Sequence, residues 1–160
     1  LPEGNKRIAS PFGFDEIEFM ISPNLGEPLR PLTKIASGGE LSRVMLALKT
    51  VLSAGDEAST LIFDEIDTGI GGEIALSIAA HMKTLSKKKQ ILCITHLAVI
   101  ASHADNHIKI EKNTIGQTTR TSASAVSGRT RTEEIARMLA GDEYSEASIK
   151  HAEELLKKYT

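Results

Sequence analysis

Two short apolar runs separated by an amphipathic stretch most constrain the fold of this chain. Residues 61–63 are apolar and end abruptly in Asp64 and Glu65, and a second apolar run covers residues 91–95. Between the two runs, apolar residues recur at helical spacing, at Ile74, Ile78, Met82 and Leu85. A strand, a helix and a second strand in this order predict a parallel β-α-β unit, whose strands end at the same edge of the sheet.

The remaining segments extend this pattern. From Ser37 onward a helix is predicted by apolar residues at Leu41, Val44, Met45, Leu48, Val51 and Leu52, and Gly55 can end it. Alternation predicts a strand over 15–22, followed by a turn at 23–26. Further along we predict a short helix over 97–104, strands over 107–111 and 117–125, and helices over 131–139 and 145–159, with Gly141 just past the first. Together these elements predict an α/β fold with a mainly parallel sheet flanked by helices.

Composition limits the classes of protein that fit. A chain of 160 residues with 41% hydrophobic content is expected to form a single domain over 1–160. Without a long apolar run or a signal peptide, we expect a cytoplasmic protein and no membrane partner. A net charge of −2 does not fit a self-sufficient DNA-binding domain. Cys93 lies in an apolar run and is expected in the core. Because the chain opens without methionine, we expect it to be part of something longer.

Residues 37–40, Ser-Gly-Gly-Glu, open the first predicted helix and allow two interpretations. As a capping box, Ser37 caps the helix and Glu40 reaches back three residues. That interpretation leaves unexplained the glycines Gly38 and Gly39, which are unfavourable in a helix. Glycines there uncover amide groups at the positive end of the helix dipole, as an approaching phosphate requires.

Asp64 and Glu65 also allow two interpretations. A strand that delivers two adjacent carboxylates to its end can place one beside Mg²⁺ and the other beside a water molecule. Solvated acids at a strand end are the simpler explanation. Only the motifs around the two carboxylates favour a functional site over solvated acids.

The order of these motifs resembles that of ABC ATPases: Ser-Gly-Gly-Glu opening a helix, Asp-Glu ending a strand, then Asp67, then a strand ending in His96. Residues 34–49, 63–69 and 93–97 resemble the SMC-like class of these ATPases that acts in bacterial DNA double-strand break repair. The resemblance covers the chain from about Asp15 to its C-terminus, and it implies the C-terminal half of a P-loop NTPase head.

The resemblance implies a role for each motif residue, with ATP and Mg²⁺ as cofactors. Ser37, Gly38 and Gly39, with Glu40, would form the signature motif, which contacts the γ-phosphate of ATP held by a second head in a homodimer. Asp64 would be the Walker B acid that holds Mg²⁺ through water.

Three further residues receive roles in the same way. Glu65 would orient the attacking water as general base. Asp67 would belong to the D-loop that crosses the dimer interface, and His96 would be the switch histidine that touches the γ-phosphate. These residue types suit phosphoryl transfer, which needs positioning, charge neutralisation and an oriented water.

One departure from the family pattern is decisive: no Gly-x-x-x-x-Gly-Lys-[Ser/Thr] occurs in the chain. The resemblance implies that this P-loop lies in an N-terminal half of the same head, beyond a coiled-coil arm, and that DNA is bound through the full-length protein. Gly71-Gly72 is a smaller departure, since a serine often precedes the second glycine. Two alternatives remain: a nucleotide-binding domain of another ABC or SMC ATPase, such as a transporter, and a non-catalytic interaction module. Leu41-Ser42-Arg43 favours the repair class over a transporter. The presence of Glu65 favours an active enzyme over a non-catalytic module.

Several other residues have simpler explanations than a site. The histidines at 96, 103 and 107 lack a Cys or acidic residue at ligand spacing. Lys87, Lys88 and Lys89 are expected in a solvated loop, and Arg120, Arg129 and Arg131 form a loose basic cluster; either set is a weak candidate for DNA phosphates. Arg43 either organises the phosphate site or lies exposed on the helix.

Overall fold

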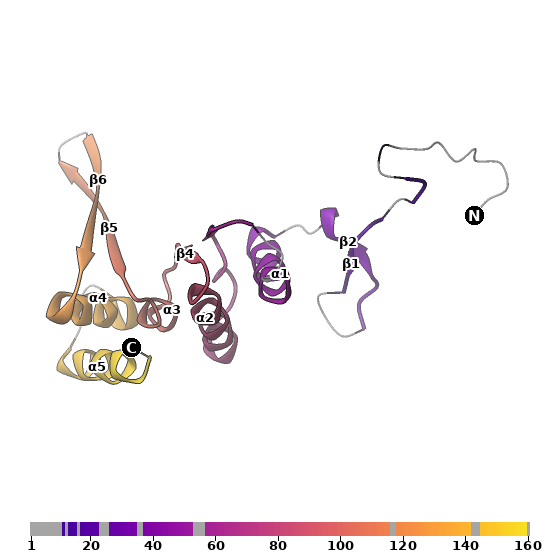
Figure 1. The fold of residues 1–160 in the computed structure, drawn as a ribbon. Helices are drawn as coiled ribbons and strands as arrows, with labels where there is room; N and C mark the ends of the chain where they lie inside the picture. The colour runs from indigo at the N-terminus through magenta and orange to yellow at the C-terminus, as the bar shows by residue number, and fades with distance from the viewer. Residues whose placement is uncertain are drawn as a thin grey trace. The chain divides into compact units, whose positions relative to one another are not determined.

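The computed structural model of the chain describes residues 11, 13–15, 17–22, 26–34, 37–52, 57–115, 118–141 and 145–159. Their contacts divide the chain into two compact units, Leu1–Ser37 and Gly38–Thr160. Figure 1 draws the helices and strands of both units and labels most of them.

The first unit holds two very short strands. β1 (Met20–Ile21) pairs antiparallel with β2 (Arg30–Pro31), and a 3₁₀ turn, η1 (Leu32–Lys34), follows directly. The strand predicted over 15–22 is therefore much shorter in the structure. Its only partner among the described residues is two residues long and ends in a proline, which has no N–H to donate to a ladder. The predicted turn lies largely outside the described residues, which include only Gly26 of it.

The second unit begins with the predicted helix and the β-α-β unit, and both predictions are confirmed. α1 (Gly38–Val51) is followed by β3 (Thr60–Phe63), α2 (Gly72–Ser86) and β4 (Gln90–Cys93). β3 and β4 pair in parallel, from Thr60 opposite Gln90 to Phe63 opposite Cys93. The carboxyl ends of the two strands therefore meet at one edge, although Gly55, the predicted end of α1, lies outside the described residues.

A hairpin and three helices complete the second unit. α3 (Ala98–Ser102) leads into β5 (His107–Ile115), which pairs antiparallel with β6 (Thr118–Val126). α4 (Gly128–Ala140) and α5 (Glu146–Tyr159) follow. Gly141 ends α4 as predicted, with a φ of 87° and its N–H donating to the carbonyl oxygen of Arg137 at 2.7 Å.

The predicted mainly parallel sheet is wrong, although the mixed α/β content is confirmed. The described residues form three two-stranded sheets, β1-β2, β3-β4 and β5-β6, and only the second is parallel. The connections explain the difference. Parallel pairing needs a long crossover, and α2 provides one between β3 and β4, whereas only two residues of sequence separate β5 from β6, which is too few for a crossover.

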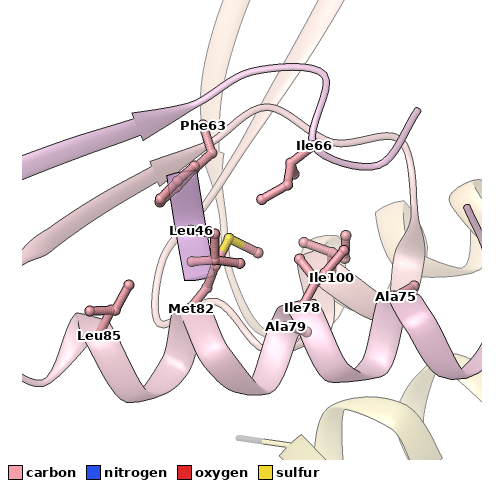
Figure 2. Close-up of a cluster of buried hydrophobic side chains, with 9 residues drawn as sticks. All are labelled: Leu46, Phe63, Ile66, Ala75, Ile78, Ala79, Met82, Leu85 and Ile100. Carbon is pink, nitrogen blue, oxygen red and sulfur yellow. The ribbon is translucent and has the colours of Figure 1, made fainter. Parts of the chain in front are cut away.

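The main core lies between α2 and the carboxyl ends of β3 and β4. Figure 2 shows its buried side chains: Leu46, Phe63, Ile66, Ala75, Ile78, Ala79, Met82, Leu85 and Ile100. Ile66, in the loop after β3, has no exposed surface. Because this loop side chain anchors in the core, the acidic segment around it has a fixed position.

A second core joins α3 to the C-terminal helices through small side chains: Ala98, Ala101, Ile135, Ala136 and Ala152. Arg131 on α4 is buried beside it, and its Nη2 donates to the carbonyl oxygens of Ala101, Ser102 and Ala104, at 3.3, 3.3 and 2.6 Å. The basic cluster predicted from the sequence therefore does not include Arg131, because this side chain caps the C-terminal end of α3.

Lys89 is a second basic residue that the sequence placed wrongly. Lys87 and Lys88 are exposed as predicted, but Lys89 is buried and its ammonium donates to the carbonyl oxygen of Ala58. The aliphatic part of the Lys89 side chain is buried, while its ammonium group reaches a backbone acceptor. Of the predicted solvated loop, only the first two lysines are available to a partner.

Candidate functional site

The first turn of α1 packs directly on the loop that follows β3. A Cβ added at Gly39 would lie 2.8 Å from the Glu65 carbonyl oxygen and 3.2 Å from the Thr68 Cβ. A Cβ added at Gly38 would lie 2.6 Å from the Glu65 carboxylate. The glycines therefore have a role inside this chain: a Cβ at Gly39 would hold the helix away from the acidic loop, whereas a Cβ at Gly38 would only displace the flexible Glu65 side chain.

Two polar residues on α1 fasten the same loop. The Ser42 hydroxyl donates to the carbonyl oxygen of Asp64 at 2.9 Å. The guanidinium Nη1 of Arg43 donates to the carbonyl oxygens of Ile66 and Thr68, at 3.2 and 3.1 Å. The sequence left two interpretations of Arg43, and the structure shows it holding the acidic loop. The sequence pointed to Ser42 only as part of the family pattern and did not predict this contact, since a serine on a half-buried helix face gives no local signal.

Asp64 and Glu65 are exposed at the carboxyl end of β3. One oxygen of Asp64 accepts the backbone N–H of Glu65 at 2.9 Å. Glu65 has a φ of 55°, in the left-handed region, and no other non-glycine residue in the described part of the chain has a positive φ. This conformation costs about 1 kcal/mol for a residue with a Cβ. Such strain is typical of functional sites. There it holds a side chain in an orientation that an unstrained backbone would not give.

Asp67 links the loop after β3 to the loop after β4. One of its oxygens accepts hydrogen bonds from the Thr95 hydroxyl at 2.5 Å and from the backbone N–H of His96 at 2.8 Å, and the ring Nδ1 of His96 lies 3.0 Å from the same oxygen. Burial by itself raises the pKa of Asp67, but these hydrogen bonds and the His96 charge together hold that pKa below its usual value. Asp67 is therefore ionised at neutral pH although it is buried.

Cys93, at the end of β4, is predicted from the sequence as a core residue, and it packs against the main core. Burial raises the pKa of its thiol to about 12, with smaller contributions from the negative charges of Asp67 and Asp64. A thiol in this state is a poor nucleophile.

The other candidate residues do not join this site. His103 stacks on Tyr159 with ring centroids 3.9 Å apart and contacts the Val99 carbonyl oxygen through Nδ1. Within the ranges that the structure describes, no three His, Cys, Asp or Glu side chains come together as a metal site. Ser37 immediately precedes α1, and Glu40 is half-buried in its first turn. The proposed signature and capping roles of these two residues stay predictions.

The acids fit a magnesium ion of the kind found with nucleotides. Mg²⁺ prefers oxygen ligands, keeps several waters, and is commonly held by one or two carboxylates together with substrate phosphates. Asp64 offers such a carboxylate in an exposed position at a strand end. A single protein carboxylate is consistent with binding through water and phosphate, and it does not suit a closed protein cage.

Comparison with solved structures defines the class. The chain resembles a chain from a study of the ATP-driven dimerization and DNA-stimulated activation of SMC ATPases, with a TM-score of 0.51 over 85% of this chain and 80% of that one. Identity is 20%, so the likeness concerns the fold alone. The fold of this chain is similar to that of the SMC ATPase chain. No helix in the described ranges has the length and apolar character needed to cross a membrane.

Sequence comparison identifies the family. The chain is 62% identical to the DNA repair protein RecN of Treponema pallidum over 152 residues, and 47% and 46% identical to the RecN proteins of Halalkalibacterium halodurans and Bacillus subtilis. These matches cover 90 to 95% of this chain but only 25 to 26% of the relatives. No family model matches. The chain is similar to a segment of RecN proteins and spans about a quarter of the length of the curated relatives it matches, and the family resemblance read from its motifs is confirmed.

Proposed function

We propose that this chain, as a single subdomain over 1–160, forms the signature, Walker B, D-loop and switch-histidine part of an ATPase head in a RecN-like protein of DNA double-strand break repair and recombination. One observation carries the proposal. The start of α1, the acidic loop after β3 and the loop holding His96 meet at the carboxyl ends of β3 and β4. Ligands of parallel α/β sheets bind at this edge.

Within its own head, the chain provides the hydrolytic residues for ATP. Asp64 holds Mg²⁺ through water, and Glu65 accepts a proton from the attacking water and orients it. His96 contacts the γ-phosphate. Bound Mg²⁺ would supply charge neutralisation at the phosphates. The packing of Gly38 and Gly39 against Glu65 keeps the strained acid in place while the reaction proceeds.

Across a homodimer, the chain completes the site of a second head. Ser37, Gly38 and Gly39, with Glu40, form the start of α1, whose amide groups and helix dipole favour an approaching γ-phosphate. The segment around Asp67 lies beside this helix start, held there by Arg43. Each head would therefore contribute its signature motif to the ATP site of the other head, with ATP bound between the two.

The whole protein would add what this chain lacks. An N-terminal half of the same head supplies the P-loop, since no such motif occurs in the 160 residues. DNA is bound through the full-length protein in the bacterial cytoplasm, at the nucleoid. We therefore expect no ATP turnover from this chain alone, which phosphate-release assays on the purified chain would check.

The test uses the full-length protein with Glu65→Gln. We expect ATP binding within about threefold of wild type and turnover reduced by more than about a hundredfold, because Glu65 orients water and does not hold nucleotide. Glu153→Gln, an exposed acid on α5, is the matched control and should leave both quantities unchanged. Turnover that survives Glu65→Gln would point to a different base, whereas a wild-type protein that binds ATP without turnover would favour a non-catalytic module.

A further inference from the structure

Asp67 faces the interior of its own chain. Its side chain is 4% exposed, whereas the side chain of His96 beside it is 73% exposed. Buried carboxylates are costly unless they are paired and hydrogen-bonded. The partners of this carboxylate from elsewhere in the chain, Thr95 and His96, both lie in the loop after β4, so the same contacts that stabilise the buried charge also fix that loop.

The carboxylate organises three consecutive residues. One oxygen of Asp67 accepts hydrogen bonds from the Thr95 hydroxyl and the backbone N–H of His96, and the ring Nδ1 of His96 lies 3.0 Å from the same oxygen. The Thr95 oxygen in turn accepts the backbone N–H of Leu97 at 3.0 Å. Residues 95–97 therefore form one hydrogen-bonded turn around Asp67, at the point where α3 begins.

We propose that Asp67 is a positioning residue for His96, which holds the imidazole by its Nδ1–H and leaves Nε2 directed outward for the nucleotide or the attacking water. The inference rests on the proposed role of His96 at an ATP site. The His96 ring has so much exposed surface that packing does not orient it. The contact with the Asp67 carboxylate instead determines which ring nitrogen points inward.

The consequence is a definite hydrogen-bonding role for each ring nitrogen. Nδ1 must carry a proton, because a carboxylate oxygen can only accept. In the neutral ring, Nε2 is then an acceptor, able to receive a proton from water. When the ring is protonated, Nε2–H becomes a donor, able to contact a phosphate oxygen.

Nitrogen NMR on this chain tests the proposal without any nucleotide. His96 is assigned among the five histidines with a His96→Gln sample, and the ring nitrogen shifts report which nitrogen bears the proton in the neutral form. We expect the Nδ1–H tautomer, although free histidine prefers Nε2–H. A wild-type His96 mainly in the Nε2–H form would overturn the proposal, whether or not any variant folds.

Variants make the test causal. Asp67→Ala should move neutral His96 to the Nε2–H form, while Asp67→Asn, which keeps an acceptor oxygen, should retain Nδ1–H. Asp105→Ala is the control, because that carboxylate is exposed and pairs with Lys83. A folded Asp67→Ala chain with His96 unchanged would contradict the assignment.

A kinetic readout in the full-length protein separates positioning from folding. Asp67→Ala should lower kcat by at least about tenfold, as loss of an orienting partner commonly does, with little change in KM for ATP. Asp67→Asn should recover most of kcat. A fall in kcat with Asn equal to that with Ala would argue against positioning by an acceptor oxygen. Because the NMR result needs no ATP, it stands apart from the Glu65→Gln result.

Discussion

Gly39 lies where α1 and the acidic loop approach most closely, so substitution there tests whether the contact matters. Gly39→Ala would put a Cβ 2.8 Å from a backbone oxygen of Glu65, which cannot move without the loop. We expect the variant to lower the free energy of unfolding by about 1–3 kcal/mol, as overpacking does. Urea unfolding of the chain measures this.

Gly38→Ala is the matched control on the same turn. Its Cβ would meet the end of the flexible Glu65 side chain, which can swing away. Since alanine is also the better helix former, unfolding should change little. Equal destabilisation by both substitutions would mean that helix geometry, and not the Glu65 backbone, sets the cost.

Cys93 gives a second prediction at the residue scale. Its pKa of about 12, against an ordinary value of 9.0, lowers the thiolate fraction near pH 8 by roughly a thousandfold. Because a thiolate of higher pKa is intrinsically more nucleophilic, part of this loss is offset, and we expect reaction with a thiol reagent to be more than about tenfold slower in the folded chain than in denaturant. A folded rate within about tenfold of the unfolded rate would show that the thiol is not held in this environment.

Among the elements, α3 ends under a buried arginine. Arg131→Met would remove the side-chain donor from the carbonyl oxygens of Ser102 and Ala104, whereas that of Ala101 keeps the backbone N–H of Ala104 at 3.3 Å. Unsatisfied buried acceptors cost about 1–3 kcal/mol each, so we expect a loss of at least about 2 kcal/mol in the free energy of unfolding. Thermal or urea unfolding measures the loss. Arg129→Met is the control on the same helix: Arg129 is exposed, and its pair with Glu133 should matter little.

The elements also show how far the sequence could predict this structure. α1, β3, α2 and β4 were predictable because their apolar spacing is local, and a β-α-β order fixes parallel pairing. The short β1 was not, since strand length depends on the partner. Nor were the φ of Glu65, the inward carboxylate of Asp67 or the burial of Lys89 and Arg131, because tertiary contacts determine each of them. The family resemblance identified the motif residues, but it did not predict how they pack against one another.

At the scale of the whole molecule, one face of the β3-β4 pair carries exposed apolar side chains among the residues that the structure describes. Ile62, Leu92 and Ile94 are exposed there, with Ile62 67% exposed, and a groove of about 260 Å³ runs between β3 and α1. Apolar surface of this kind favours association. We expect light scattering across a concentration series to reveal a dimer or larger species of the isolated chain.

Two variants locate the association. Ile62→Lys on β3 should shift the chain toward monomer, whereas Ile110→Lys, on an equally exposed face of the β5-β6 hairpin, should not. A monodisperse monomer of wild-type chain at high concentration would mean that the exposed apolar residues of β3 and β4 do not drive contact between chains.

The central claim is that Ser37 acts across a dimer while Glu65 acts within its own head. ATP-dependent dimerisation of full-length protein tests it most directly, with Ser37→Arg and Glu65→Gln compared side by side. We predict that Glu65→Gln dimerises with ATP and remains dimeric because turnover is blocked. Ser37→Arg should bind ATP and stay monomeric, since a bulky side chain occupies the place where the partner's γ-phosphate meets the start of α1. Dimerisation of Ser37→Arg at the wild-type ATP concentration would contradict the account.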